Sequence, residues 1–308
     1  MSKHKKADNN QLSLFTPVIS QMVPAKDQQD IMQYPFFSLS KRKRTTPIEY
    51  DDGNVYIKVL GTEEKGIANI FDADVLIFIA SQLMEAINKN QPTSPEIRVS
   101  KYQLLEFVGK ATGGKSYQQL EKSLDRLQET SIETSIRQDG QRKRWKFSWI
   151  ADWMAVEHEH TGKPIAIRFR INEWIYKSII EEKLVLTIDR KYFELEGGIE
   201  RFLYRLARKV AGRDSVLCMK MKSLHKRSGS PEKPKKFRDS VVQAIFKGKI
   251  PEYHFKIIEE SIEKEEWIFA SRKKWDNELI LSYIYSLKQK PEYAQALRKV
   301  HRSRSGNK

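Results

Sequence analysis

The residues whose spacing most clearly suggests chemistry lie between Gly109 and Ser116. The run Gly-Lys-Ala-Thr-Gly-Gly-Lys-Ser fits a phosphate-binding P-loop at every fixed position, with Lys115 for phosphate and Ser116 for magnesium. A P-loop must follow a strand inside a parallel β-α-β unit. The preceding residues 102–108 instead have helical spacing and follow a capping serine, Ser100. We therefore interpret the glycines as the turn of a helix-turn-helix and keep nucleotide hydrolysis as an alternative.

The helix that we expect over residues 116–129 has one apolar face and one polar face. The apolar face carries Tyr117, Leu120, Leu124 and Leu127. In a helix-turn-helix the second helix enters the major groove, where amides, lysines and arginines bond base edges or phosphates. The candidate DNA-binding residues of this helix are Lys115, Ser116, Gln118, Gln119, Lys122 and Arg126. A solvated helix face is the alternative interpretation, because lysine and glutamine are also good exposed helix formers.

Further cations are candidates for DNA contact. Between strands expected over residues 131–137 and 145–156, a polar loop is predicted to be a wing that reaches phosphates or the minor groove. Its candidate residues are Arg142, Lys143, Arg144 and Lys146. A second reading helix is expected over residues 235–247, with the candidates Lys235, Lys236, Arg238, Ser240, Gln243 and Lys247. The early run Lys41–Arg44 is another candidate for phosphate contact, and solvated loops and faces remain the alternative.

The overall charge favours a polyanionic partner. The 308 residues include 56 Lys and Arg against 40 Asp and Glu, a net charge of +16, which makes nucleic acid the first candidate and an anionic membrane surface the second. The longest apolar run, residues 75–80, is too short to span a bilayer, and no signal peptide is expected. We therefore expect a cytoplasmic protein that does not enter the membrane.

Few residues suggest catalysis or metal binding. The single cysteine, Cys218, excludes an intramolecular disulfide and a cysteine-rich zinc site. The segment Glu157–His160 contains two histidines but lacks further ligands nearby, and we interpret it as a solvated linker. We predict no catalytic residues, no metal site and no cofactor, so the chain is not expected to be an enzyme.

The order of the predicted elements indicates how the reading residues are positioned. Asp72 is expected to cap a helix over residues 73–88, which a short strand over 97–99 follows. Helices over 101–107 and 116–129 then flank the glycine turn. Followed by a basic hairpin, this is the order of a winged helix, which is one form of the helix-turn-helix.

The second half of the chain repeats this pattern weakly. A helix over residues 199–210, with its arginines mostly on the solvent side, precedes helices over 221–226 and 235–247. Strands over 253–258 and 266–270 would form a second wing. We therefore predict an α+β fold with two tandem winged-helix domains. The predicted division is a disordered tail over 1–33, domains over 34–160 and 161–290, and a basic C-terminal tail over 291–308.

The N-terminal tail contains one dense apolar cluster, Gln11-Leu12-Ser13-Leu14-Phe15, in an otherwise polar composition that predicts disorder. The cluster is similar to the pentapeptide by which bacterial proteins bind the replicative sliding clamp. That resemblance implies that Leu12, Leu14 and Phe15 enter an apolar groove while Gln11 supplies a polar anchor. A local patch that docks on its own domain is the alternative.

Three stretches resemble the plasmid replication initiator protein A family, namely Tyr34–Lys41, Thr112–Tyr117 and Leu120–Leu127. The resemblance covers most of residues 34–275 and is most specific up to Arg137. It implies a bacterial protein with two winged-helix domains that bind repeated double-stranded sites at a plasmid origin, as in iteron-binding initiators. It further implies opening of an AT-rich segment, with single-stranded DNA as a further partner, recruitment of the replicative helicase and repression of its own promoter.

These observations lead to one main hypothesis and two alternatives. The main hypothesis is a plasmid replication initiator, with a homodimeric storage form left open. The first alternative is a sequence-specific transcriptional repressor with the same reading helices, which would need neither duplex opening nor the cluster at residues 11–15. The second alternative is a nucleotide hydrolase that uses Lys115.

Overall fold

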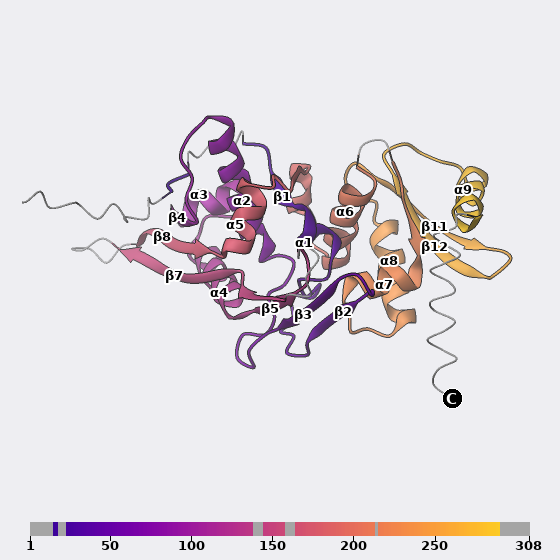
Figure 1. The fold of residues 1–308 in the computed structure, drawn as a ribbon, viewed down its shortest axis with the longest axis horizontal. Helices are drawn as coiled ribbons and strands as arrows, with labels where there is room; N and C mark the ends of the chain where they lie inside the picture. The colour runs from indigo at the N-terminus through magenta and orange to yellow at the C-terminus, as the bar shows by residue number, and fades with distance from the viewer. Residues whose placement is uncertain (1–14, 18–22, 138–143, 158–163, 213–214, 290–308) are drawn as a thin grey trace, which may run out of the picture.

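The computed structural model describes residues 15–17, 23–137, 144–157, 164–212 and 215–289 (Figure 1). These residues form an α+β fold, as the sequence predicts, in which helices pack around four small antiparallel sheets. Within these ranges, no helix combines the length and the apolar character that a membrane crossing requires.

The first unit of the fold contains a helix, a strand, two helices and, after two inserted strands that join another sheet, a final pair of strands. Its elements are α2 (Ala73–Asn88), β4 (Glu96–Val99), α3 (Lys101–Phe107), α4 (Gly114–Glu129), β7 (Ile150–Glu157) and β8 (Pro164–Ile171). The three strands form one sheet in the order β4-β8-β7. The three expected helices are confirmed, and α3 begins with a capping box between Ser100 and Gln103. Gly109 follows α3 with a φ of +67°, a conformation that favours glycine.

The second unit repeats this order without the two inserted strands. Its elements are α6 (Gly198–Val210), β10 (Leu217–Lys220), α7 (Met221–Ser228), α8 (Pro234–Phe246), β11 (His254–Glu260) and β12 (Glu265–Ser271). Its sheet has the strand order β10-β12-β11, which corresponds strand for strand to β4-β8-β7. An added helix, α9 (Asn277–Gln289), packs against β11 (Figure 1). In this correspondence α4 and α8 occupy the same place in the two units.

The hairpin that the sequence suggested as the first wing belongs to a different sheet. A four-stranded sheet contains β2 (Ile48–Asp51), β3 (Tyr56–Leu60), β5 (Ser131–Thr134) and β6 (Trp145–Ser148), in that order. The single strand expected over residues 145–156 is therefore two strands in two sheets. They separate at Trp149, which is fully buried and stacks on Phe37 at 4.9 Å between ring centroids. The hairpin that corresponds to β11–β12 is β7–β8.

Part of the predicted N-terminal tail is folded, so the expected disorder is wrong for residues 23–33. Strand β1 (Lys26–Gln28) pairs with β9 (Val185–Thr187), and helix α1 (Gln29–Gln33) packs against α6. Four apolar side chains of this stretch are buried: Val23, Ala25, Ile31 and Met32. Phe15 is buried as well and forms a parallel bridge with Ile97 at the edge of β4.

The units are not divided at residue 160. Strand β8, which begins after that point, pairs with both β4 and β7 of the first unit. Helix α5 (Glu173–Ile180) then packs against α2, and a short 3-10 helix, η1 (Arg190–Glu194), leads to α6. One continuous apolar core contains residues of both units, from Phe15 to Ala270. The change from the first to the second unit therefore lies near Gly198, where α6 begins.

The arginines of α6 hold the two units together, which corrects the expectation that they face solvent. Arg205 is 2% exposed and forms two hydrogen bonds to Asp27 of β1, at 2.6 and 2.9 Å. Arg201 is 1% exposed and donates to Asp74 of α2 at 2.6 Å. Arg208 donates to the Thr187 carbonyl at 2.7 Å. Buried charges need partners of this kind, and here the first unit supplies them all.

Candidate nucleic-acid interface

Helix α4 presents its polar face beside a hollow of about 540 Å³. Leu120, Leu124 and Leu127 are buried against the first unit, so the opposite side of the helix is exposed. The hollow is lined by Lys115, Ser116, Gln119 and Ser123 of α4 together with Lys41 from the N-terminal side of the chain. Lys115, Gln118, Gln119 and Lys122 are exposed, and their side chains have no bonded partner among the described residues. These four side chains are available to a ligand.

Arg126 does not belong to this available set, although the sequence placed it there. Its guanidinium donates two hydrogen bonds to Asp72, at 2.8 and 2.6 Å, and the Asp72 side chain is 1% exposed. Burial alone would lower the pKa of Arg126, but the hydrogen bonds and charge of Asp72 outweigh it and raise that pKa. The Asp72 side chain makes no cap bond to α2, contrary to the sequence prediction. Arg126 fixes α4 to the start of α2 and has a structural role.

Helix α8 presents its polar face beside a second hollow, of about 580 Å³. Ser240, Gln243 and Lys247 line it from α8, and residues 38–40 and 42–46 of the first unit line it from the other side. Lys235 and Gln243 are exposed without a side-chain partner in the described part of the chain. The structure thus brings three predicted residues of α8 together with the early basic run, which the sequence could not place relative to α8.

Three of the predicted cations near α8 have partners within the second unit. Arg238 binds both carboxylate oxygens of Glu266 on β12, with its closest contact at 2.7 Å. Lys236 pairs with Glu232 at 3.1 Å, and Lys247 pairs with the buried Glu200 at 3.1 Å. This bidentate ion pair between Arg238 and Glu266 connects α8 to its sheet. The pair formed by Lys236 is an exposed one, and such pairs are weak enough to exchange for a phosphate.

The chain from Ser38 to Thr46, hereafter the basic segment, borders both hollows. Its Arg44 guanidinium donates to three carbonyls, those of Thr46 at 2.9 Å, Pro47 at 2.9 Å and Gly229 at 2.6 Å. Burial lowers the pKa of Arg44. A Cβ on Gly198 would lie 1.8 Å from the Leu39 carbonyl oxygen, so the segment approaches the start of α6 too closely for any other residue. The segment is thus fixed between the two units.

The predicted wing residues lie apart from both hollows or outside the described residues. Arg142 and Lys143 are outside the described ranges, as are His158–Lys163 between β7 and β8. Arg144 pairs with Glu133 at 2.9 Å and lies over the Tyr56 ring at 4.3 Å. Lys146 is exposed on β6. Because β6 belongs to the sheet of β2 and β3, these cations are not placed as the wing of the first unit.

The P-loop alternative lacks the strand that it requires. Helix α3 precedes Gly109, and α4 begins at Gly114, so the glycines connect two helices. Lys110 pairs with Asp74 at 2.8 Å, and the same carboxylate binds Arg201 of the second unit. The described residues contain no group of three acidic, histidine or cysteine side chains arranged for a metal ion.

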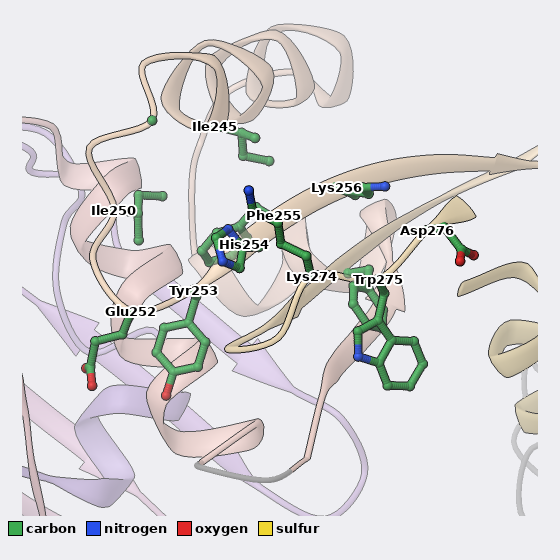
Figure 2. Close-up of a pocket in the computed structure, with 12 residues that line it drawn as sticks. Ile245, Ile250, Glu252, Tyr253, His254, Phe255, Lys256, Lys274, Trp275 and Asp276 are labelled. Carbon is green, nitrogen blue, oxygen red and sulfur yellow. The ribbon is translucent and has the colours of Figure 1, made fainter. Parts of the chain in front are cut away.

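A third hollow, of about 700 Å³, was not suggested by the sequence. It lies between the C-terminal end of α8, β11 and the loop after β12, and Figure 2 shows Phe255, Lys274 and Trp275 around it. None of its lining residues borders the hollows beside α4 and α8. It is therefore separate from the candidate interface.

Two comparisons of the sequence point to the same protein family. The model of the family described as replication initiator protein A matches residues 26–255. A putative replication protein of Wigglesworthia glossinidia brevipalpis is 33% identical over 228 residues, which cover 73% of this chain and 82% of the relative.

Two solved structures share the fold. A crystal structure of domains 2 and 3 of RctB has a TM-score of 0.56 at 13% identity and covers 78% of this chain and 95% of that chain. A second RctB structure, also of domains 2 and 3, has a TM-score of 0.52 at 15% identity and covers 82% and 98%. These identities support a similarity of fold alone. The match over residues 26–255 and the relative at 33% identity go further and confirm the resemblance drawn from the sequence: the chain belongs to the replication initiator protein A family.

Proposed function

We propose that this protein initiates plasmid replication by binding repeated double-stranded sites at the origin with two winged-helix modules. One observation carries the proposal. Helices α4 and α8 occupy the same place in two units whose helices and three-stranded sheets correspond, and each has unpartnered polar side chains beside a hollow that the basic segment borders. In a winged helix this is the helix that enters the major groove, and β7–β8 and β11–β12 would be the wings.

The chemistry of the available side chains suits this role. Gln118 and Gln119 can bond adenine edges, whereas Lys115 and Lys122 suit guanine or phosphate. The net charge of +16 favours association with a polyanion. Two reading helices on one chain would contact two neighbouring groove segments, so a monomer suits an asymmetric site repeated in tandem. A symmetric repressor would instead favour a palindrome.

The experiment that tests the proposal is selection of bound duplexes from a random pool by the full chain, in about 150 mM salt to suppress non-specific phosphate binding. We expect an asymmetric motif that spans about two turns of duplex and recurs in tandem at an origin. A palindromic motif would favour the transcriptional repressor. Absence of enrichment would contradict sequence-specific binding altogether.

Alanine variants of one glutamine on each helix test which helix reads which part of the motif. Gln118→Ala and Gln243→Ala should each weaken binding to the selected duplex by about tenfold, the cost of one lost base contact. Each should relax the sequence preference at a different part of the motif. Gln91→Ala, an exposed glutamine in the loop after α2, is the matched control and should bind like the wild type.

We further propose the later steps of initiation on the basis of the family resemblance. They are opening of an AT-rich segment with contact to its single strand, recruitment of the replicative helicase, and binding of the sliding clamp by the cluster at residues 11–15. Gln11, Leu12 and Leu14 lie outside the described residues, whereas Phe15 is 7% exposed against its own fold. Clamp binding would thus require Phe15 to leave this site. An unchanged plasmid copy number after replacement of Leu12 and Leu14 by alanine would contradict the clamp proposal.

A further inference from the structure

The basic segment holds its shape without any ligand. The Ile70 amide donates to the Ser38 carbonyl at 2.9 Å, and the Ile67 amide donates to the Arg44 carbonyl at 2.7 Å. Between these two anchors, the Arg42 amide donates to the Ser40 hydroxyl at 3.1 Å. Because the backbone is fixed on both sides of Arg42, the segment presents this side chain at a defined place before DNA arrives.

Arg42 differs from the other cations of the basic segment. The Lys41 ammonium lies 4.4 Å from the centre of the Phe71 ring, the Lys43 ammonium donates to the Glu63 carbonyl at 3.0 Å, and Arg44 binds three carbonyls. Arg42 is exposed, and its guanidinium has no hydrogen bond, ion pair or ring contact to any residue that the structure describes. It is the cation of this segment that is free to bind an anionic ligand.

The position of the segment indicates which part of the DNA Arg42 would meet. Lys41 borders the hollow beside α4, and Arg42 borders the hollow beside α8, so the segment runs between the two reading helices. Helices that read successive major-groove segments on one face of B-DNA lie about 34 Å apart, and the minor groove faces the protein between them. If α4 and α8 read successive segments in this way, a side chain of the segment that runs between them would face that minor groove.

We propose that Arg42 enters this central minor groove and makes the protein prefer A·T pairs at the middle of its site. A narrow, A·T-rich minor groove has an enhanced negative potential that attracts arginine. The planar guanidinium is less strongly hydrated than an ammonium and suits such a groove better than lysine. The proposal rests on the proposed function, since it needs both reading helices on one duplex.

Inosine substitution separates minor-groove contact from major-groove contact. An I·C pair presents the minor groove of A·T, without the guanine amino group, and the major-groove oxygen and nitrogen acceptors of G·C. The affinity of the full chain is measured for the selected duplex with its central pairs as A·T, I·C or G·C. We expect A·T and I·C to bind alike and G·C to bind about tenfold more weakly. Equal weakening by I·C and G·C would overturn the proposal.

Variants of Arg42 test whether its side chain causes the preference for central A·T pairs. Arg42→Ala should bind all three duplexes alike, at the affinity that the wild type has for G·C, and Arg42→Lys should recover little of the preference. Lys273→Ala, which removes an exposed cation after β12 outside both hollows, is the control and should keep the preference. Loss of affinity by one common factor on all three duplexes would make Arg42 a phosphate contact and overturn the proposal.

The glutamine variants distinguish this failure from failure of the proposed function. Unchanged affinity in both Gln118→Ala and Gln243→Ala would contradict reading by α4 and α8, and with it the central position of Arg42. Weakened binding in both, combined with an Arg42→Ala variant that still prefers A·T, would overturn the assignment of Arg42 alone.

Discussion

Lys122 and Arg126 lie one helical turn apart on α4 but have different surroundings, and this difference can be measured. Lys122 is exposed, whereas Arg126 neutralises a carboxylate of Asp72 that is almost fully buried. Lys122→Ala should lower DNA affinity and reduce by about one the slope of the logarithm of affinity against the logarithm of salt concentration. It should leave the free energy of unfolding nearly unchanged.

Arg126→Ala should instead lower the free energy of unfolding by about 3 kcal/mol, because Asp72 would be left buried without a partner. Urea denaturation and DNA titration of both variants give the comparison. The opposite result, a stable Arg126→Ala variant with a reduced salt slope, would return Arg126 to the DNA contacts.

Local sequence patterns identify the exposed residues of α4 but not the partner of Arg126. Lys115, Gln118, Gln119 and Lys122 could be selected as exposed because helical spacing places them opposite three leucines. Nothing in that spacing separates Arg126 from them, since its partner Asp72 lies 54 residues earlier. The same limit applies to α6, where the amphipathic pattern puts arginines on a solvent face that the first unit covers. Long-range ion pairs leave no local signal in a sequence.

At the scale of elements, helix α9 is held to the second sheet by a contact that depends on pH. The Lys288 ammonium donates to Glu260 of β11, and this hydrogen bond holds the pKa of that carboxyl at about 2. A carboxyl group whose pKa is depressed stabilises the fold at pH values above its ordinary pKa of 4.5, and this stabilisation is lost as the pH falls toward 2. Glu260→Gln should therefore lower the free energy of unfolding at pH 7.

The same variant should lose less stability than the wild type between pH 4.5 and pH 2, since it lacks the titrating group. Urea denaturation at several pH values measures this difference. Glu259→Gln, a change at the exposed neighbouring position on β11, is the control. A parallel acid dependence in the wild type and Glu260→Gln would show that the contact does not stabilise the fold.

Element order was predicted better than element pairing. Helices α2, α3 and α8 follow from caps and apolar periodicity, which are local, and their observed limits agree with the expected ones to within one residue. The pairing of β5 and β6 with β2 and β3 was missed because strand partners far apart in sequence are not encoded locally. Strand β1 was missed because three residues next to a proline-containing polar tail give no periodicity to read.

At the scale of the whole molecule, the buried pair of Arg205 and Asp27 should determine whether the two units fold together. Arg205→Ala should lower the free energy of unfolding by about 3–5 kcal/mol, because it leaves Asp27 buried and unpaired. Lys209→Ala, a change on the same helix at a half-buried lysine bonded to Gln29, should cost less than about 1 kcal/mol.

The reactivity of the Cys218 thiol measures whether weakening the junction between the two units also unfolds the second unit. Burial raises the pKa of Cys218 to about 12, so the folded protein should react slowly with a thiol reagent at pH 8. Arg205→Ala should increase this rate. A stability loss that leaves the thiol protected would mean that the second unit stays folded when the junction is weakened.

The docking of Phe15 against β4 has a consequence for any partner that uses the N-terminal cluster. The Phe15 amide donates to the Glu96 carbonyl at 2.8 Å, and the Arg98 amide donates to the Phe15 carbonyl at 3.0 Å. One phenylalanine cannot occupy two grooves, so a partner that takes it must compete with the protein itself. Were about one molecule in a hundred undocked, the apparent dissociation constant of such a partner would be about a hundredfold higher than its intrinsic value. Conversely, any event that releases Phe15 from the edge of β4 would raise the affinity for that partner by up to the same factor.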